Sequence, residues 1–90
     1  MALDRDKLYG LSLEVVQLLM RKNNDYGSSY FELRDEYGYV AFLVRLADKF
    51  ARLKHLAENK PAFEDESVED TLKDIVGYCL LELYYQNFVK

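Results

Sequence analysis

Apolar residues recur every three or four positions over three long stretches of the chain, which is the spacing of amphipathic helices. The first predicted helix runs from residue 4 or 12 to residue 23, the second spans residues 39–59 and the third spans residues 67–88. A shorter helical turn is predicted over residues 30–37, and Gly38 is expected to end it. No stretch alternates apolar and polar residues for long enough to form a strand. The predicted fold class is therefore all-α, a small bundle of three main helices in one domain.

The second half of the third predicted helix is apolar on nearly every side. One stripe is expected to face the core and contains Leu72, Ile75, Val76, Cys79, Leu80 and Leu83. Tyr78, Leu81 and Tyr85 point away from that stripe. A helix that is apolar all round is buried on all sides, which a three-helix monomer cannot easily provide. We therefore expect these three residues to lie between the chains of a homo-oligomer; the alternative is that the tyrosines lie on the surface.

The same helix begins with a row of acids. Glu66, Asp70 and Asp74 stand at steps of four, which brings their carboxylates to one face. Like charges at this spacing repel, and a bound Mg²⁺ would relieve that repulsion because it is held by carboxylate oxygens and water. The alternative is a solvated acidic face near a helix N-terminus, where the helix dipole favours acids. Ser67 is expected to cap the helix N-terminus.

The second predicted helix carries charges opposite its apolar stripe. Arg45, Lys49 and Arg52 are candidates to bind phosphate oxygens. Asp48 lies among them and is a candidate to join the acids of the third helix around a metal. The alternative is that Asp48 only forms exposed ion pairs with the two arginines, three and four positions away.

Residues 23–29 are rich in Asn, Asp, Gly and Ser and are predicted to form a loop after the first helix. Tyr26 lies in this loop and is expected to stack on a base or sugar, with Lys22 one turn earlier contacting phosphate. The alternative is that Tyr26 packs onto the bundle and anchors the loop.

The composition limits the classes of partner. The net charge of −4 argues against a binder of duplex nucleic acid, which needs a basic surface. A small anionic ligand stays possible, because a local group of basic residues or a metal can bind phosphate. No apolar run approaches the roughly 20 residues that span a bilayer, so we expect a cytoplasmic protein with no membrane contact. The single Cys79 excludes an internal disulfide.

Several short motifs follow one another in an order that resembles a known family. They are Lys22, Asp25-Tyr26-Gly27-Ser28, Arg45, Asp48-Lys49, Arg52-Leu53, Glu66-Ser67, Asp70-Thr71, Asp74 and Gly77-Tyr78. This pattern resembles the nucleotide modification associated domain 1 proteins, which are common in phages and prophages. The resemblance implies a nucleotide-related role in a bacterial host cell. The family is in turn distantly similar to all-α nucleoside triphosphate pyrophosphatases of the MazG and dimeric dUTPase type, in which acids on two helices hold Mg²⁺.

Three functions agree with these observations. The first is Mg²⁺-dependent hydrolysis of a nucleoside triphosphate, with Asp70 or Asp74 orienting or deprotonating water and Mg²⁺ held by Asp48, Glu66, Asp70 and Asp74. The second is binding without turnover, which would sequester a nucleotide or cyclic nucleotide signal. Its ligand contacts would be the same candidates, Lys22, Tyr26, Arg45, Lys49 and Arg52. The third is a helical module that binds a host protein through its tyrosine-rich face.

Overall fold

A computed structural model describes the backbone of residues 1–26, 28–58 and 64–90, and the side chains of residues 1–23, 28–58 and 68–90. The described residues contain no strand, which confirms the all-α class. The helices are α1 (Arg5–Tyr26), α2 (Ser29–Tyr37), α3 (Val40–Glu58) and α4 (Glu64–Tyr84), and a short π-helix, η1 (Tyr85–Val89), continues α4.

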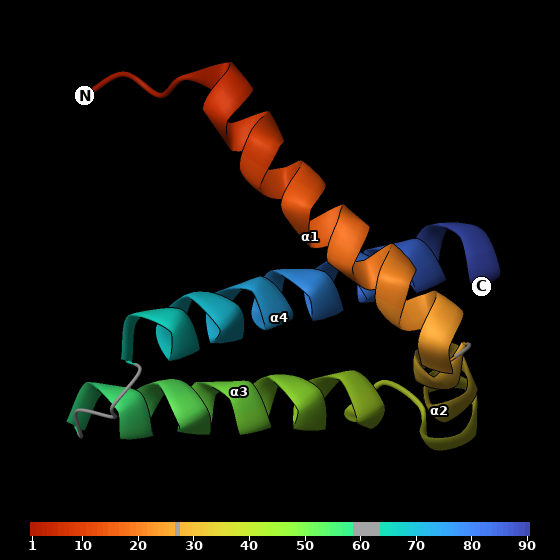
Figure 1. Ribbon diagram of the computed structural model, residues 1–90. Coiled ribbons are helices and arrows are strands. Elements are labelled where there is room, and N and C mark those ends of the chain that lie inside the picture. Colours follow the sequence, from red (N-terminus) through yellow and green to blue (C-terminus); the bar gives the residue numbers. More distant parts are fainter. Residues whose placement is uncertain (27, 59–63) are drawn as a thin grey trace.

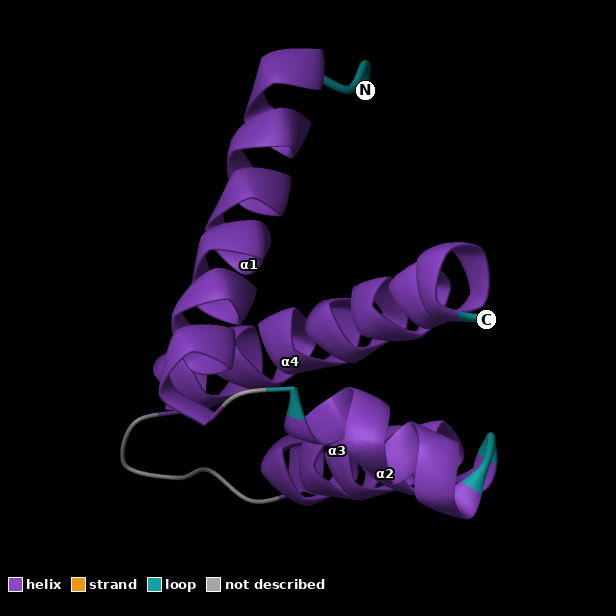
Figure 2. Cartoon of the chain, turned by 90° about the vertical axis from the view of Figure 1, so that its right-hand side faces the viewer, coloured by secondary structure: helices purple, strands orange, loops and turns teal. Residues whose placement is uncertain are grey.

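Helices α3 and α4 lie side by side and antiparallel, and together they form a hairpin (Figure 1). Helix α1 crosses α4, and its first turns project beyond the hairpin (Figure 2). The short α2 packs at the end of the hairpin where α4 continues into η1. No helix in the described part of the chain is long and apolar enough to cross a membrane.

Local hydrogen bonds explain the start of α1 and the end of α2. Asp4 caps α1, since its Oδ1 accepts a hydrogen bond from the backbone N–H of Lys7 at 3.1 Å. Gly38 ends α2 as predicted: it adopts φ +77°, a conformation that favours glycine, and its N–H donates to the carbonyl of Arg34 at 2.9 Å.

Two predicted boundaries are wrong. Helix α1 continues to Tyr26, so the polar residues 24–26 are helical instead of forming the start of a loop. Helix α4 begins at Glu64, so Ser67 lies inside its first turns and is not its N-cap. Both errors come from weak local preferences of Asn, Asp and Ser, which the surrounding structure overrides. The last turns of α1 are held from outside by an ion pair between Lys22 and α4.

The burial of several apolar residues of α4 differs from the prediction. Leu72, Val76 and Leu83, which the sequence assigned to the core, are 49%, 47% and 56% exposed. Tyr85, which was expected between chains, is only 4% exposed and packs within its own chain. Tyr78 and Leu81 are half-buried and face a cavity beside α1. The correction has a simple reason, because a helix that is apolar all round does not reveal which side its neighbours cover.

A buried carboxylate joins α2 to α4. The side chain of Glu82 is 5% exposed and accepts hydrogen bonds from the hydroxyl of Tyr30 at 2.8 Å and from Arg34 at 2.9 and 3.2 Å. Gln86, one turn later, donates a further bond at 2.7 Å. Both oxygens of the carboxylate are thus satisfied, which a buried charge requires.

Aromatic rings surround this ion pair. The guanidinium of Arg34 lies 4.5 Å from the ring centre of Tyr85 and 5.4 Å from that of Tyr39. The hydroxyl of Tyr85 donates to Asp35 at 2.6 Å, and its ring stacks with Phe31. The polar contacts and the ring contacts together fix α2 on the end of α4.

The first prediction concerns the stability of this junction. Glu82→Gln removes the charge that Arg34 pairs with, so the free energy of unfolding should fall by about 3 kcal/mol, the scale of a broken buried ion pair. Thermal or urea unfolding measures this. Glu36→Gln on the exposed side of α2 is the matched control and should change stability by less than about 0.5 kcal/mol. Equal effects of the two substitutions would contradict the buried role of Glu82.

The second prediction concerns pH. Burial alone would raise the pKa of Glu82, but hydrogen bonds from Arg34, Gln86 and Tyr30 outweigh it and hold the pKa below its usual value of 4.5. A lowered folded-state pKa stabilises the protein above about pH 4.5, and this contribution is lost as pH falls further. The difference in unfolding free energy between wild type and Glu82→Gln should therefore shrink as pH decreases below 4.5. A difference that stays constant in acid would disprove the lowered pKa.

Candidate functional site

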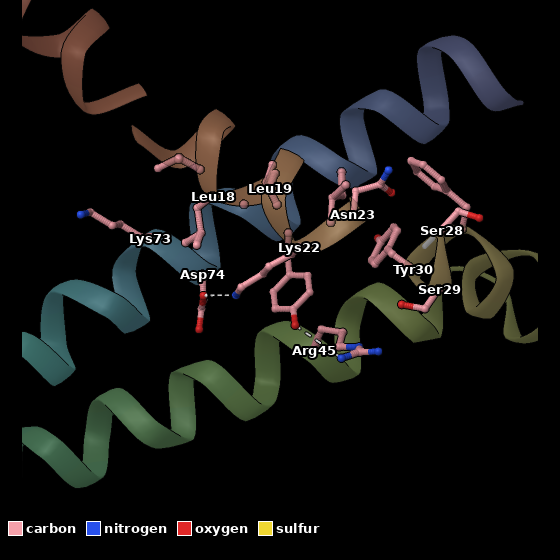
Figure 3. A pocket seen from close by; sticks show the side chains of 15 residues that line it. Leu18, Leu19, Lys22, Asn23, Ser28, Ser29, Tyr30, Arg45, Lys73 and Asp74 are labelled. Carbon is pink, nitrogen blue, oxygen red and sulfur yellow. Dashed lines mark hydrogen bonds and ion pairs between the residues drawn. The ribbon is translucent and has the colours of Figure 1, made fainter. Parts of the chain in front are cut away.

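A cavity of about 380 Å³ lies where α1 crosses the hairpin, and the first residues of α2 close one end of it. Helix α1 contributes an apolar wall made by Val15, Leu18 and Leu19. Three aromatic rings from α2 and α4 also line the cavity: Tyr30, Phe31 and Tyr78. Its charged lining residues are Lys22, Arg45, Lys73 and Asp74 (Figure 3). A volume of this size is within the range of small-molecule sites.

Gly77 sets the distance between α1 and α4 at the cavity. A Cβ atom at this position would lie 3.2 Å from Cδ2 of Leu19 and 3.9 Å from Cγ1 of Val15. The first distance is shorter than an ordinary van der Waals contact, so the absence of a side chain allows the two helices to approach closely. This close crossing places the apolar wall of α1 opposite the charged residues of α4.

Asp74 is held between two lysines. Its Oδ1 lies 3.3 Å from Nζ of Lys22 on α1 (Figure 3). Its Oδ2 lies 3.1 Å from Nζ of Lys49 on α3. One carboxylate thus connects three helices at the cavity. Because Lys22, Arg45 and Lys73 line the cavity with Asp74 as the only acid among its described lining residues, this region is locally cationic on a protein whose net charge is −4.

Arg45 and the rings of the cavity form a second group. Nη1 of Arg45 donates to the hydroxyl of Tyr78 at 3.4 Å, and the guanidinium lies 5.6 Å from the centre of that ring. The ring centres of Tyr78 and Tyr30 are 6.2 Å apart. Burial and the hydrogen bond to Glu82 raise the pKa of the Tyr30 hydroxyl, so Tyr30 stays neutral at physiological pH.

The structure brings together some of the predicted ligand residues. Lys22 and Arg45 line the cavity, and Lys49 joins them through Asp74. Arg52 does not line it and lies exposed on α3. The side chain of Tyr26 lies outside the described residues, so its stacking role stays a prediction.

The acids expected to hold Mg²⁺ are placed differently. Asp48 and Asp70 are exposed and do not line the cavity, while Asp74 does but is paired with lysines. The side chain of Glu66 lies outside the described part. Among the side chains that are described, no group of three or more His, Cys, Asp or Glu residues is positioned to hold a metal ion. The described acids Asp48, Asp70 and Asp74 are therefore not gathered around one metal position, and magnesium binding and catalysis by Asp70 or Asp74 stay predictions.

The sequence alone did not reveal several lining residues. Tyr30 and Phe31 lie in a segment predicted only as a helical turn, and Lys73 was not singled out. Lys73 pairs with Glu14 of α1 at 3.4 Å and with Glu69 at 3.6 Å. The sequence did contain an indication that Tyr30 and Phe31 contact other elements. These two adjacent aromatic side chains stand at the start of a nine-residue helix, which is too short to bury their apolar surface by itself.

Comparison with known protein families identifies a match over most of the chain. The sequence model of the family described as nucleotide modification associated domain 1 matches residues 22–84. No curated protein and no solved structure matches the chain. The matched segment contains all the charged residues that line the cavity and the three rings, whereas the apolar wall of α1 precedes it.

Proposed function

Because the chain belongs to the nucleotide modification associated domain 1 family, we propose that its cavity binds a nucleotide. The observation that carries the proposal is the meeting of basic side chains and aromatic rings in one small cavity. Lys22 and Arg45 come from different helices and line the same cavity as Tyr30 and Tyr78, and Arg45 contacts Tyr78. Basic side chains bind phosphate groups, and aromatic rings pack against a base or a sugar.

The phosphate binds on the side of Lys22 and Arg45. The guanidinium of Arg45 offers paired N–H donors that match phosphate oxygens, and the lysines add charge. Without a ligand, Asp74 keeps Lys22 and Lys49 in position. On binding, the phosphate takes over part of the role of Asp74 as the counter-ion of these lysines.

The base packs on the aromatic side of the cavity. Stacking of a base on an aromatic ring contributes about 1–3 kcal/mol and tolerates different bases. The hydroxyl of Tyr30 is tied to Glu82, so its ring is held in place before the ligand arrives. A ring that is already ordered loses little conformational entropy on binding.

Binding without turnover is the form of this function that we favour. A carboxylate that already neutralises two lysines is a poor partner for a cation, because those lysines repel it. The alternative is Mg²⁺-dependent hydrolysis of the MazG type by a phage protein. The titrations described below distinguish it from binding, because hydrolysis releases products and binding leaves the ligand intact.

The third prediction tests the site with two arginines of the same helix. The protein is titrated calorimetrically with a panel of nucleoside mono-, di- and triphosphates and cyclic dinucleotides, with and without Mg²⁺, and each ligand is recovered and identified. Arg45→Ala should weaken binding about 10- to 100-fold, the scale of a lost charge-assisted hydrogen bond. Arg52→Ala removes the same charge outside the cavity and should leave affinity within about twofold. Equal losses, or no binding of any member of the panel, would overturn the proposal.

Asp74→Asn distinguishes anion binding from metal-dependent hydrolysis by the sign of its effect. If the cavity binds phosphate directly, removal of this negative charge should tighten binding about fivefold, because repulsion between charges near a protein surface is of order 1 kcal/mol. If Asp74 holds Mg²⁺, the same substitution should abolish both Mg²⁺-dependent binding and product formation. Intact recovered ligand together with tighter binding supports the proposal, and Mg²⁺-dependent products lost in the variant refute it.

A further inference from the structure

The chain exposes more surface than a compact monomer of its size. Its accessible area is 7154 Å², whereas a compact monomer of 10.6 kDa exposes about 5,500 Å². Its radius of gyration is 14.7 Å, against about 12 Å for a compact domain of 90 residues. A typical protein interface removes about 800 Å² from each partner. The surplus of about 1,700 Å² is thus large enough for a stable interface.

Part of this surplus is an exposed apolar row on α4, which we call the α4 seam. It consists of Leu72, Val76, Cys79 and Leu83, at steps of four, three and four. Cys79 is half-buried, and the other three are 47–56% exposed. Alternating steps of four and three are the spacing of helices that pack side chains into a partner helix.

Helix α3 carries a matching row, the α3 seam. It consists of Leu43, Ala47 and Phe50, at steps of four and three, all of them exposed. Lys54 takes the next position of this row, where a long side chain can lay its methylene groups on an apolar surface and keep its charge in water. Two adjacent helices therefore carry the same kind of unpartnered apolar row.

Both seams lie on the side of the hairpin opposite the cavity. On α4, Gly77 faces α1 and Tyr78 contacts α3. Successive residues of a helix are about 100° apart around its axis, so the α4 seam lies roughly 100° or more from both of these residues. On α3, Arg45 lines the cavity, and the α3 seam lies roughly 140–160° from it around the helix axis. Helices α3 and α4 pack side by side, and both seams lie on the face of the hairpin that is turned away from the cavity.

We propose that this face binds a second copy of the same chain, so that two α3–α4 hairpins form a four-helix bundle. Three observations select a second copy: the surplus area exceeds the roughly 800 Å² that each partner of an interface buries, the charges in line with the seams, Lys54 and Glu69, are opposite in sign, and both helices have the residue spacing of bundle seams. The cavity stays open, because α1 crosses the other side of the hairpin and α2 lies at its end. The interface does not depend on the proposed nucleotide site.

The fourth prediction tests this interface by sedimentation equilibrium or multi-angle light scattering of the full chain at tens of micromolar. Wild type should have twice the mass of a 10.6 kDa chain. Val76→Glu places a charge in the α4 seam and should halve the measured mass, since a desolvated unpaired charge is costly. A wild-type mass of one chain would overturn the proposal.

Leu13→Glu is the matched control. Leu13 is 54% exposed on α1, similar to Val76 at 47%, but it lies on the helix that projects beyond the hairpin. This variant should remain a dimer with the wild-type mass. A dimer of Val76→Glu together with a monomer of Leu13→Glu would assign the interface to α1 instead and would disprove the α3–α4 face.

Cys79 gives a second readout that needs no substitution. It is the single cysteine and lies within the α4 seam, so a dimer should shield its thiol. Its reaction with an aromatic disulfide reagent should be about tenfold slower at a concentration that favours dimers than after dilution to monomers. A rate that does not depend on protein concentration would refute the proposal, even if Val76→Glu fails to fold.

Discussion

The ion pair between Glu82 and Arg34 determines how the rest of this small protein is arranged. Few apolar side chains are buried within the described residues, and they are Val15, Tyr30, Phe42 and Tyr85. Two of these, Tyr30 and Tyr85, pack around the ion pair and are anchored by hydrogen bonds at its edge. The burial of Glu82 is tolerable only because donors from α2 and from the next turn of its own helix satisfy both of its oxygens. The packing of the rings and the satisfaction of the charge therefore depend on each other.

This junction also shapes the cavity. Tyr30 uses its hydroxyl to bind Glu82 and its ring to line the cavity, and Phe31 follows it in α2. The cavity thus has one wall that is fixed by a buried ion pair. The opposite wall depends on the close crossing of α1 over Gly77, and Asp74 links the lysines of α1 and α3. Each wall is held by contacts that join residues about 25 to 60 positions apart in the sequence.

The sequence predicted the helices well and their faces poorly. Periodicity identified α2, α3 and the two long flanking helices within a few residues, and Gly38 marked the turn between α2 and α3. Periodicity states which residues share a face, but it does not state which face is covered when several faces are apolar. For that reason the exposed Leu72 and Leu83 were assigned to the core, and Tyr85, which packs within its own chain, was assigned to a contact between chains.

The sequence identified some residues of the candidate site but not their partners on other helices. Lys22 and Arg45 were identified from their charge and position, and they do line the cavity. The row of acids was interpreted as a metal site or as a solvated acidic face, because steps of four show neighbours on one helix only, and metal binding stays a prediction. The lysines that pair with Asp74 come from two other helices, one of them 52 residues earlier in the chain. A buried acid such as Glu82 is equally hard to recognise, since its partner Arg34 is 48 residues away.

The two sides of the α3–α4 hairpin have different physical characters. One side is crossed by α1 and carries the charged and aromatic cavity, which α2 borders at the end of the hairpin, whereas the other side carries exposed apolar seams. The charged residues and rings of the cavity all lie in the part of the chain that the family shares, and the apolar wall of α1 lies before it. Recognition of a phosphate would then depend on the shared segment, while the fit around the rest of a ligand would depend on α1. A ligand that touches both parts would hold α1 onto the hairpin, because it adds contacts between two elements that otherwise meet mainly at Gly77 and at a few ion pairs.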